Sequence, residues 1–204
     1  ENAAKLFLAK DIKLPYYFGF NNLVTISSNN IEQFISFASE LFEGMLSNRI
    51  SGIETLLKAE QQEKIIIEVV KKKWDELHTL LPESDSVINF LSNLGEYCYK
   101  ITHTPTASYA PGINGFAIQS NRTLKLIPDQ NWDEDEIFSK LRTVLNICLA
   151  FNLLEIKKVH QGVKEQTWDV YYLNRWVCIK YNLPLTYGGW NKLTPKELFK
   201  WIKN

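Results

Sequence analysis

The spacing of apolar residues changes along this chain, and the change limits the folds that the chain can adopt. Before residue 104 these residues recur every three or four positions, which is the period of a helix packed on one side. After residue 111, two stretches, 112–128 and 156–173, alternate apolar and polar residues around short polar turns, which predicts two β-hairpins. The sequence therefore predicts an α+β fold, mainly α, with an N-terminal helical bundle followed by a region with two hairpins.

Capping residues mark where several helices begin. Asn29 tolerates a left-handed backbone at a helix end, and Asn30 is expected to cap the next helix, with Gln33 completing a capping box. Ser84 and Thr194 are expected to cap two later helices. The helices are predicted over 2–12, 20–27, 31–48, 59–81, 84–103, 133–153, 174–182 and from Pro195 onward. In the helix from residue 31, one buried face is expected to hold Ile31, Phe34, Ile35, Ala38, Leu41, Phe42 and Met45.

Composition and charge restrict the classes of partner. Hydrophobic residues make up 45% of the 204 residues, enough for a sizeable packed core. The formal net charge is zero, which argues against a wholly basic nucleic-acid-binding protein. However, residues 155–204 carry nine basic and four acidic side chains, a net charge of +5, while residues 1–82 and 83–154 are each net acidic. Any contact with phosphate is therefore expected in the last fifty residues, although an ordinary solvated surface explains the same charge.

The candidate DNA-binding residues lie in and after the second predicted hairpin. They are Lys157, Lys158, Lys164, Arg175 and Lys180. Aromatic residues interleave with them and would suit stacking on single strands, or would alternate into the core: Trp168, Tyr171, Tyr172 and Trp176. The helix over 133–153 could serve as a recognition helix before the hairpin, but four acidic residues, 133–136, open it and would oppose phosphate.

The chain lacks the local motifs of common catalytic sites. It has no GxxxxGK[ST] phosphate loop, no GxGxxG and no GxSxG. His78, His103 and His160 stand apart without a metal-binding partner at helical spacing, and the acids at 133–136 match a helix dipole without any cation. We therefore expect no catalytic residue, no metal and no cofactor in this segment.

A site assembled from scattered residues stays open as a weaker alternative. Asn174, Arg175 and Tyr187 are polar groups among apolar neighbours and could form such a site. The simpler interpretation is that Asn174 and Arg175 cap the short helix that follows.

The cysteines and the ends of the sequence suggest a cytoplasmic protein. Cys98, Cys148 and Cys178 are far apart and form no CxxC pair, which favours buried, reduced thiols. No apolar run is long enough for a membrane span, and no signal peptide opens the sequence. Because the sequence begins with Glu1, we expect a piece of a longer protein.

Five stretches in order carry a resemblance to a known family. They are "GFNNLVTISSNNIEQFISFASELFEGM" (19–45), "YAPGINGFAIQ" (109–119), "FNLLE" (151–155), "YYLNRWVCIKYNLPLTYGGW" (171–190) and "ELFKWI" (197–202). Together they resemble the C-terminal region of bacterial AAA+ ATPases of the origin-recognition and initiator type. In the first stretch, Ser27, Ser28, Asn30 and Phe34 match the pattern of the lid, the small helical domain of these ATPases, while Asn29 replaces the usual glycine.

The resemblance implies a domain organisation and a function. It implies a helical lid-like segment over 1–57 and a helical, winged-helix-like domain over 58–204, with hairpins near 112–128 and 156–173. The chain would then be a non-catalytic segment that couples the nucleotide state of an AAA+ ATPase to DNA or to a protein partner. ATP and Mg²⁺ would bind in the parent protein. The implied partners are its upstream ATPase domain, DNA and further copies of the parent protein.

A second position also departs from the family pattern. In such lids an arginine near the start of this helix reaches the γ-phosphate of ATP. The corresponding nucleotide-sensing position falls at Asn30 and Glu32, and the carboxylate of Glu32 would repel phosphate.

The alternative function is a protein-interaction or sensor module without a nucleic-acid or nucleotide role. The zero net charge and the aromatic content of 13% favour it. Its expected sign is an exposed apolar patch around Trp190, Phe199 and Trp201.

Overall fold

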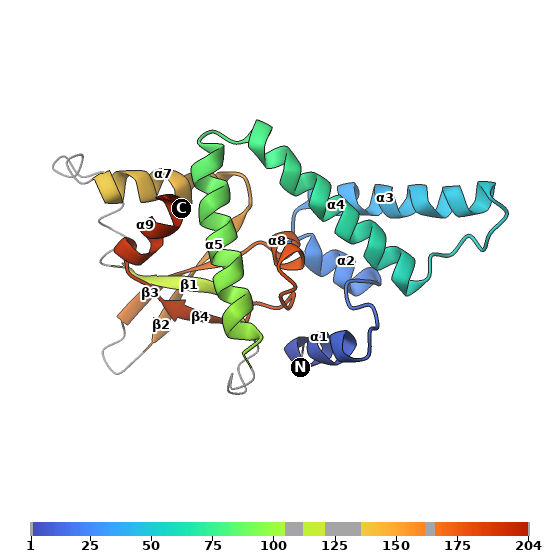
Figure 1. Ribbon diagram of the computed structural model, residues 1–204, viewed down its shortest axis with the longest axis horizontal. Helices are drawn as coiled ribbons and strands as arrows, with labels where there is room; N and C mark the ends of the chain where they lie inside the picture. The colour runs from blue at the N-terminus through green and yellow to red at the C-terminus, as the bar shows by residue number, and fades with distance from the viewer. Residues whose placement is uncertain (1, 105–111, 121–135, 162–165, 204) are drawn as a thin grey trace. The chain divides into compact units, whose positions relative to one another are not determined.

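The computed structural model describes residues 2–104, 112–120, 136–161 and 166–203 (Figure 1). The chain forms two compact units. The first comprises Glu1–Glu76 with Arg175–Thr186, and the second comprises Leu77–Asn174 with Tyr187–Asn204. This division differs from the limits predicted at 1–57 and 58–204, because a segment late in the chain packs with the N-terminal helices.

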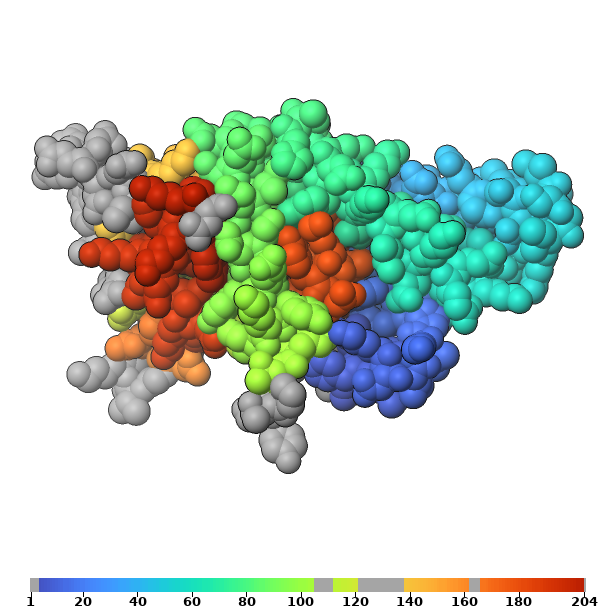
Figure 2. Space-filling model, viewed as in Figure 1, coloured from blue at the N-terminus to red at the C-terminus, as the bar shows by residue number. Residues whose placement is uncertain are grey.

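The first unit is helical. It contains α1 (Asn2–Asp11), α2 (Phe20–Ile26), α3 (Ile31–Ile50), α4 (Ala59–Leu80) as far as Glu76, and α8 (Arg175–Lys180). Trp74 of α4 packs edge-on against Trp176 of α8, with ring centroids 6.5 Å apart. The Tyr17 hydroxyl donates to the carbonyl of Leu183 at 2.9 Å. Figure 2 shows the segment Arg175–Thr186, in dark orange, against the teal residues of α4.

Local capping at the start of α3 follows the prediction in part. Asn29 has a φ of 59°, and the Asn30 side chain accepts from the backbone N–H of Gln33 at 3.1 Å. The Gln33 side chain donates instead to the carbonyl of Ile26 at 2.6 Å, so it does not close a capping box. The predicted Ser84 cap is wrong: α5 (Ser84–Thr102) has Glu83 at its N-cap position, without a side-chain cap.

The predicted buried face of α3 is wrong in part: Phe34, Ala38, Leu41 and Met45 are partly buried, but the other three predicted residues are exposed. Ile31, Ile35 and Phe42 are 72%, 58% and 58% exposed, while Phe37 is fully buried. Apolar spacing shows that two faces of a helix differ, but the neighbouring elements decide which face is covered. Here α4 packs close to Gly44 of α3, where an added Cβ would lie 2.7 Å from Ile65.

The second unit is a four-stranded sheet with helices. Its helices are α5, α7 (Glu136–Ala150) and α9 (Pro195–Lys203), and its strands are β1 (Ile113–Gln119), β2 (Leu154–Gln161), β3 (Gln166–Leu173) and β4 (Gly189–Lys192). The strand order is β2-β3-β1-β4, with β4 parallel to β1 and the other pairs antiparallel.

The strand pairing confirms the second predicted hairpin, because β2 and β3 pair from Leu154↔Leu173 to Gln161↔Gln166. Both edges of β1 are occupied, by β3 and β4. The second arm of the other predicted hairpin, at 121–128, lies outside the described residues. The strand β4 was not predicted, because its four residues are too few to show a period.

Helices α5, α7 and α9 lie on one side of this sheet (Figure 1). On that side Phe116 of β1 stacks on Tyr171 of β3, with centroids 5.1 Å apart, and meets Phe90 of α5 edge-on at 6.0 Å. The described order α5, β1, α7, β2, β3 is winged-helix-like and confirms the predicted fold class. None of the described helices of this unit lies on the opposite side of the sheet, which we call the open face.

The remaining local predictions concern the last helix and the cysteines. Thr194 caps α9, and its N–H and hydroxyl both donate to Glu197 Oε2 at 2.7 Å. All three cysteines are buried, and none of them forms a disulfide. None of the helices in the described part of the chain combines the length and apolar character that a membrane span needs.

Candidate nucleic-acid interface

Helix α7 carries a polar surface opposite its core-facing side. Leu141, Val144, Leu145 and Cys148 are buried beneath it. Thr143 and Asn146 are exposed, with Ser139 and Arg142 partly exposed beside them. We call Ser139, Arg142, Thr143 and Asn146 the α7 polar face. From Phe138 to Ala150 the helix has no acidic residue, so the expected opposition to phosphate does not extend along it. Residues 133–135 of the acidic cluster lie outside the described residues.

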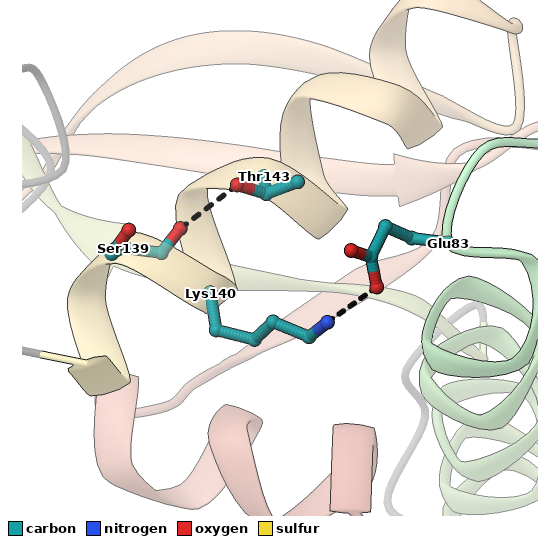
Figure 3. Close-up of polar contacts among 4 residues, drawn as sticks. All are labelled: Glu83, Ser139, Lys140 and Thr143. Atoms are coloured by element: carbon teal, nitrogen blue, oxygen red, sulfur yellow. Dashed lines mark hydrogen bonds and ion pairs between the residues drawn. The ribbon is translucent and has the colours of Figure 1, made fainter.

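The polar contacts on α7 are weak ones (Figure 3). Lys140 pairs with Glu83, and this contact lowers the pKa of the Glu83 carboxyl. The two side chains remain 34% and 47% exposed, and solvent-screened ion pairs of this kind contribute little to stability. The Thr143 hydroxyl donates to the Ser139 carbonyl at 3.1 Å within the same helix. Lys140 can therefore leave Glu83 for another anion at little cost.

The two described lysines of the hairpin lie on opposite sides of the sheet. Lys158 pairs in register with Asp169 and shares the helix-covered side with Tyr171. Lys157 pairs with Val170 and lies on the open face. Both lysines are exposed. Lys164 lies outside the described residues.

The other two candidate cations belong to the first unit and have contacts there. Arg175 Nε donates to the carbonyl of Leu185 at 2.9 Å, and its Nη1 donates to the Ser28 hydroxyl at 3.2 Å. The Lys180 ammonium lies 4.4 Å from the centre of the Trp74 ring, and burial lowers its pKa. These contacts give Arg175 a structural role, because they join the segment Arg175–Thr186 to Ser28 of the N-terminal helices.

The open face gathers four of the described aromatic residues, of which only Trp168 and Tyr172 were considered from the sequence for stacking on nucleic acid. Trp168 lies 6.1 Å from Trp190, and Tyr172 lies 4.7 Å from Tyr187, measured between ring centroids. Tyr171 lies on the other side of the sheet, stacked on Phe116. Trp176 lies in the first unit. Sequence reasoning did not place Tyr187, Trp190 or Lys192 at this surface, because the strand β4, which holds Trp190 and Lys192 and directly follows the loop with Tyr187, was not predicted.

The apolar patch predicted around Trp190, Phe199 and Trp201 does not exist as a single exposed surface. Phe199 is only 8% exposed, and Trp201 packs against Phe90 and Tyr97. The three residues come from β4 and from two positions of an amphipathic helix whose apolar side faces the core.

The scattered polar residues are likewise separated. Asn174 is 2% exposed, and its backbone N–H donates to the carbonyl of Leu153 at 3.0 Å. Tyr187 lies against Tyr172 on the open face, whereas Arg175 belongs to the first unit. Among the described residues, no group of three or more His, Cys, Asp or Glu side chains is arranged to hold a metal ion.

The two residues at the predicted nucleotide-sensing position, Asn30 and Glu32, lie at the start of α3. The Asn30 side chain is engaged with the Gln33 backbone. Glu32 is exposed in the first turn of α3. Neither side chain offers a cation to a phosphate.

Comparison with known proteins identifies one family. The model of the ORC-CDC6-like family matches residues 3–193 of this chain. No curated protein and no solved structure matches it.

Proposed function

This chain belongs to the ORC-CDC6-like family, and we propose that it is a non-catalytic segment of an AAA+ ATPase that couples nucleotide state to DNA. In this proposal the second unit binds duplex DNA, and the first unit contacts the ATPase domain. ATP and Mg²⁺ bind in that domain.

The proposal that this unit binds DNA rests on the α7 polar face and on the position of α7 directly before the β2–β3 hairpin. A helix fits the major groove of duplex DNA, and Asn and Arg side chains can hydrogen-bond to base edges there. In α7, Asn146 and Arg142 occupy such a surface, and the helix is followed directly by a lysine-bearing hairpin. Lys158 lies on the side of the sheet that α7 covers, so it can reach phosphate while α7 faces the bases.

The test measures the affinity of the chain for a fluorescent duplex at several salt concentrations. Asn146→Asp is nearly isosteric and adds a negative charge, and it should weaken binding about tenfold. Lys158→Glu should also weaken binding and should make the dependence of affinity on salt shallower by about one unit of slope. Lys200→Glu is the matched control, because Lys200 lies on the exposed side of α9 and its substitution changes the net charge as much as Lys158→Glu does. Equal losses for all three variants, or no duplex binding at all, would remove the DNA part of the proposal.

A second candidate function, docking of a protein, is favoured by α3. Its exposed apolar residues form one stripe along the helix: Ile31, Ile35, Phe42, Leu46 and Ile50, from 40% to 86% exposed. Contiguous apolar surface of this kind commonly marks a protein contact. Within the proposal its partner is the ATPase domain. In the alternative it is an unrelated protein, and the chain then serves as an interaction module.

A further inference from the structure

The open face of the sheet brings together residues from all four strands. Strand alternation and register place on it Lys157 of β2, Trp168 and Tyr172 of β3, Gly115 of β1, and Trp190 and Lys192 of β4. Tyr187, just before β4, packs on the same cluster. Glu155 is the acidic residue that register places on the described part of this face. The α7 polar face lies on the other side of the sheet.

The outer rings of this cluster are partly open to solvent. Trp168 and Tyr172 are 9% and 6% exposed and form its floor. Trp190 and Tyr187 are only partly buried above them. Their rings are tilted by 35° and 46° to their floor partners, so they are not closed into parallel stacks. Flat, partly exposed aromatic rings on a protein surface are groups on which nucleobases stack.

Two lysines lie on the rings of this face. The Lys157 ammonium is 3.9 Å from the centre of the Tyr187 ring, and the Lys192 ammonium is 4.5 Å from that of Trp168. Both lysines are exposed, and a cation–π contact at an exposed site is weaker than the stacking of a base on an aromatic ring. A strand of nucleic acid can therefore displace the ammonium groups and pair them with its phosphates.

A buried donor on this face is also unmatched. The indole Nε1 of Trp168 is buried and has no hydrogen-bond acceptor in the described part of the chain. Buried donors are seldom left unpaired, and those that are often mark a ligand or a bound water. A base carbonyl or a phosphate oxygen would supply the acceptor.

From these observations we infer that the open face binds single-stranded nucleic acid, with bases stacked on Trp190 and Tyr187 and phosphates paired with Lys157 and Lys192. The ring faces select flat bases, and the two ammonium groups select the anionic backbone. This site goes beyond the duplex-binding surface of the proposed function and does not depend on it.

The test measures the binding of a fluorescent single-stranded oligothymidylate to the chain by anisotropy. Trp190→Leu removes a stacking ring and should weaken binding about tenfold or more. Lys157→Gln and Lys192→Gln should each weaken binding several-fold and should make its dependence on salt shallower by about 0.7 unit of slope.

Lys158→Gln is the matched control, because this lysine is the next residue along β2 but lies on the opposite side of the sheet. It should leave oligothymidylate affinity unchanged. Circular dichroism verifies that each variant is folded, and the two exposed lysine variants keep the test decisive if Trp190→Leu unfolds. The inference is overturned if the parent chain does not bind the oligonucleotide, or if Lys157→Gln and Lys158→Gln bind alike.

The two binding proposals fail separately. Asn146→Asp should weaken duplex binding and leave oligothymidylate binding unchanged, and Lys192→Gln should do the reverse. If Asn146→Asp weakens both equally, the open face is not a separate site.

Discussion

At the scale of single residues, Gly115 shows how closely the strands of the second unit approach. A Cβ at this position would lie 2.4 Å from the carbonyl oxygen of Tyr171 and 2.9 Å from the Tyr172 ring. The Tyr171 carbonyl belongs to the backbone of the paired strand and cannot move without disturbing the ladder. Gly115 therefore matters because of space rather than because of its backbone angles.

We expect Gly115→Ala to lower the free energy of unfolding by about 1–3 kcal/mol, the usual cost of overpacking. Urea denaturation measures this change. Because Gly115 also lies on the open face, the same variant should weaken oligothymidylate binding only in proportion to the fraction unfolded.

Gly52→Ala is the comparison for this residue. Gly52 has a φ of +69° and nothing within 4 Å of an added Cβ, so the substitution costs only backbone strain, about 1 kcal/mol. If Gly115→Ala proves no more costly than Gly52→Ala, the space at Gly115 is not the constraint.

At the scale of the element, α9 shows how hydrogen bonds in the first turn stabilise the start of a helix. The Glu197 carboxylate accepts from both the N–H and the hydroxyl of Thr194, and the Glu197 N–H returns a bond to the Thr194 hydroxyl at 3.3 Å. These bonds favour the ionised carboxylate and lower the Glu197 pKa, with the Thr194 backbone bond as the largest cause. The helix presents Leu198, Phe199 and Ile202 to the core.

The lowered pKa predicts how the stability depends on pH. Because the folded chain binds a proton at Glu197 more weakly than the unfolded chain, this contribution is present above the ordinary glutamate pKa and is lost as pH falls through the folded value. We expect Glu197→Gln to lower Tm near pH 7, and the difference from the parent chain to shrink as pH falls from about 5 to 3.

Thermal unfolding followed by circular dichroism across this pH range measures the effect. Thr194→Ala removes one of the two donors to the carboxylate, so it should keep part of the pH dependence. A Tm difference for Glu197→Gln that stays constant with pH would show that the carboxylate charge does not stabilise α9.

At the scale of the whole molecule, the chain divides its surfaces between two units. The first unit carries the exposed apolar stripe of α3, and the second carries the α7 polar face and the open face. The proposed coupling requires both kinds of surface, one for the ATPase domain and one for DNA. It also requires that the two contacts be separable by mutation.

We expect Phe42→Ser to leave duplex affinity of this chain unchanged, because Phe42 is exposed and lies in the first unit. In a protein that joins this chain to its ATPase domain, the same variant should abolish the difference in duplex affinity between the ATP-bound and ADP-bound forms. Duplex titrations in the two nucleotides measure this difference.

Ser39→Ala, on the same helix, is the control because it leaves the stripe apolar. If the difference in duplex affinity between the ATP-bound and ADP-bound forms persists in Phe42→Ser, the apolar stripe of α3 contacts a partner other than the ATPase domain. The interaction-module alternative would then be favoured.

The sequence by itself determined the features that depend on near neighbours along the chain. The helices, the caps at Asn30 and Thr194, and the β2–β3 hairpin were predictable, because hydrogen bonds and side-chain periodicity over a few residues define them. The fold class followed from the same signals. The resemblance in the ordered motifs likewise needed no structure, and the family match over residues 3–193 confirms it.

Only the tertiary structure decided what depends on partners distant in sequence. It covered Phe37 of α3 and left Phe42 exposed, it placed Arg175–Thr186 with the N-terminal helices, and it paired β4 with β1. It also brought Trp190 and Lys192 of β4 to the same side of the sheet as Lys157 of β2. The physical reason is that burial and strand pairing are set by contacts between segments far apart in the chain, as in the bond from Tyr17 to Leu183, which are 166 residues apart.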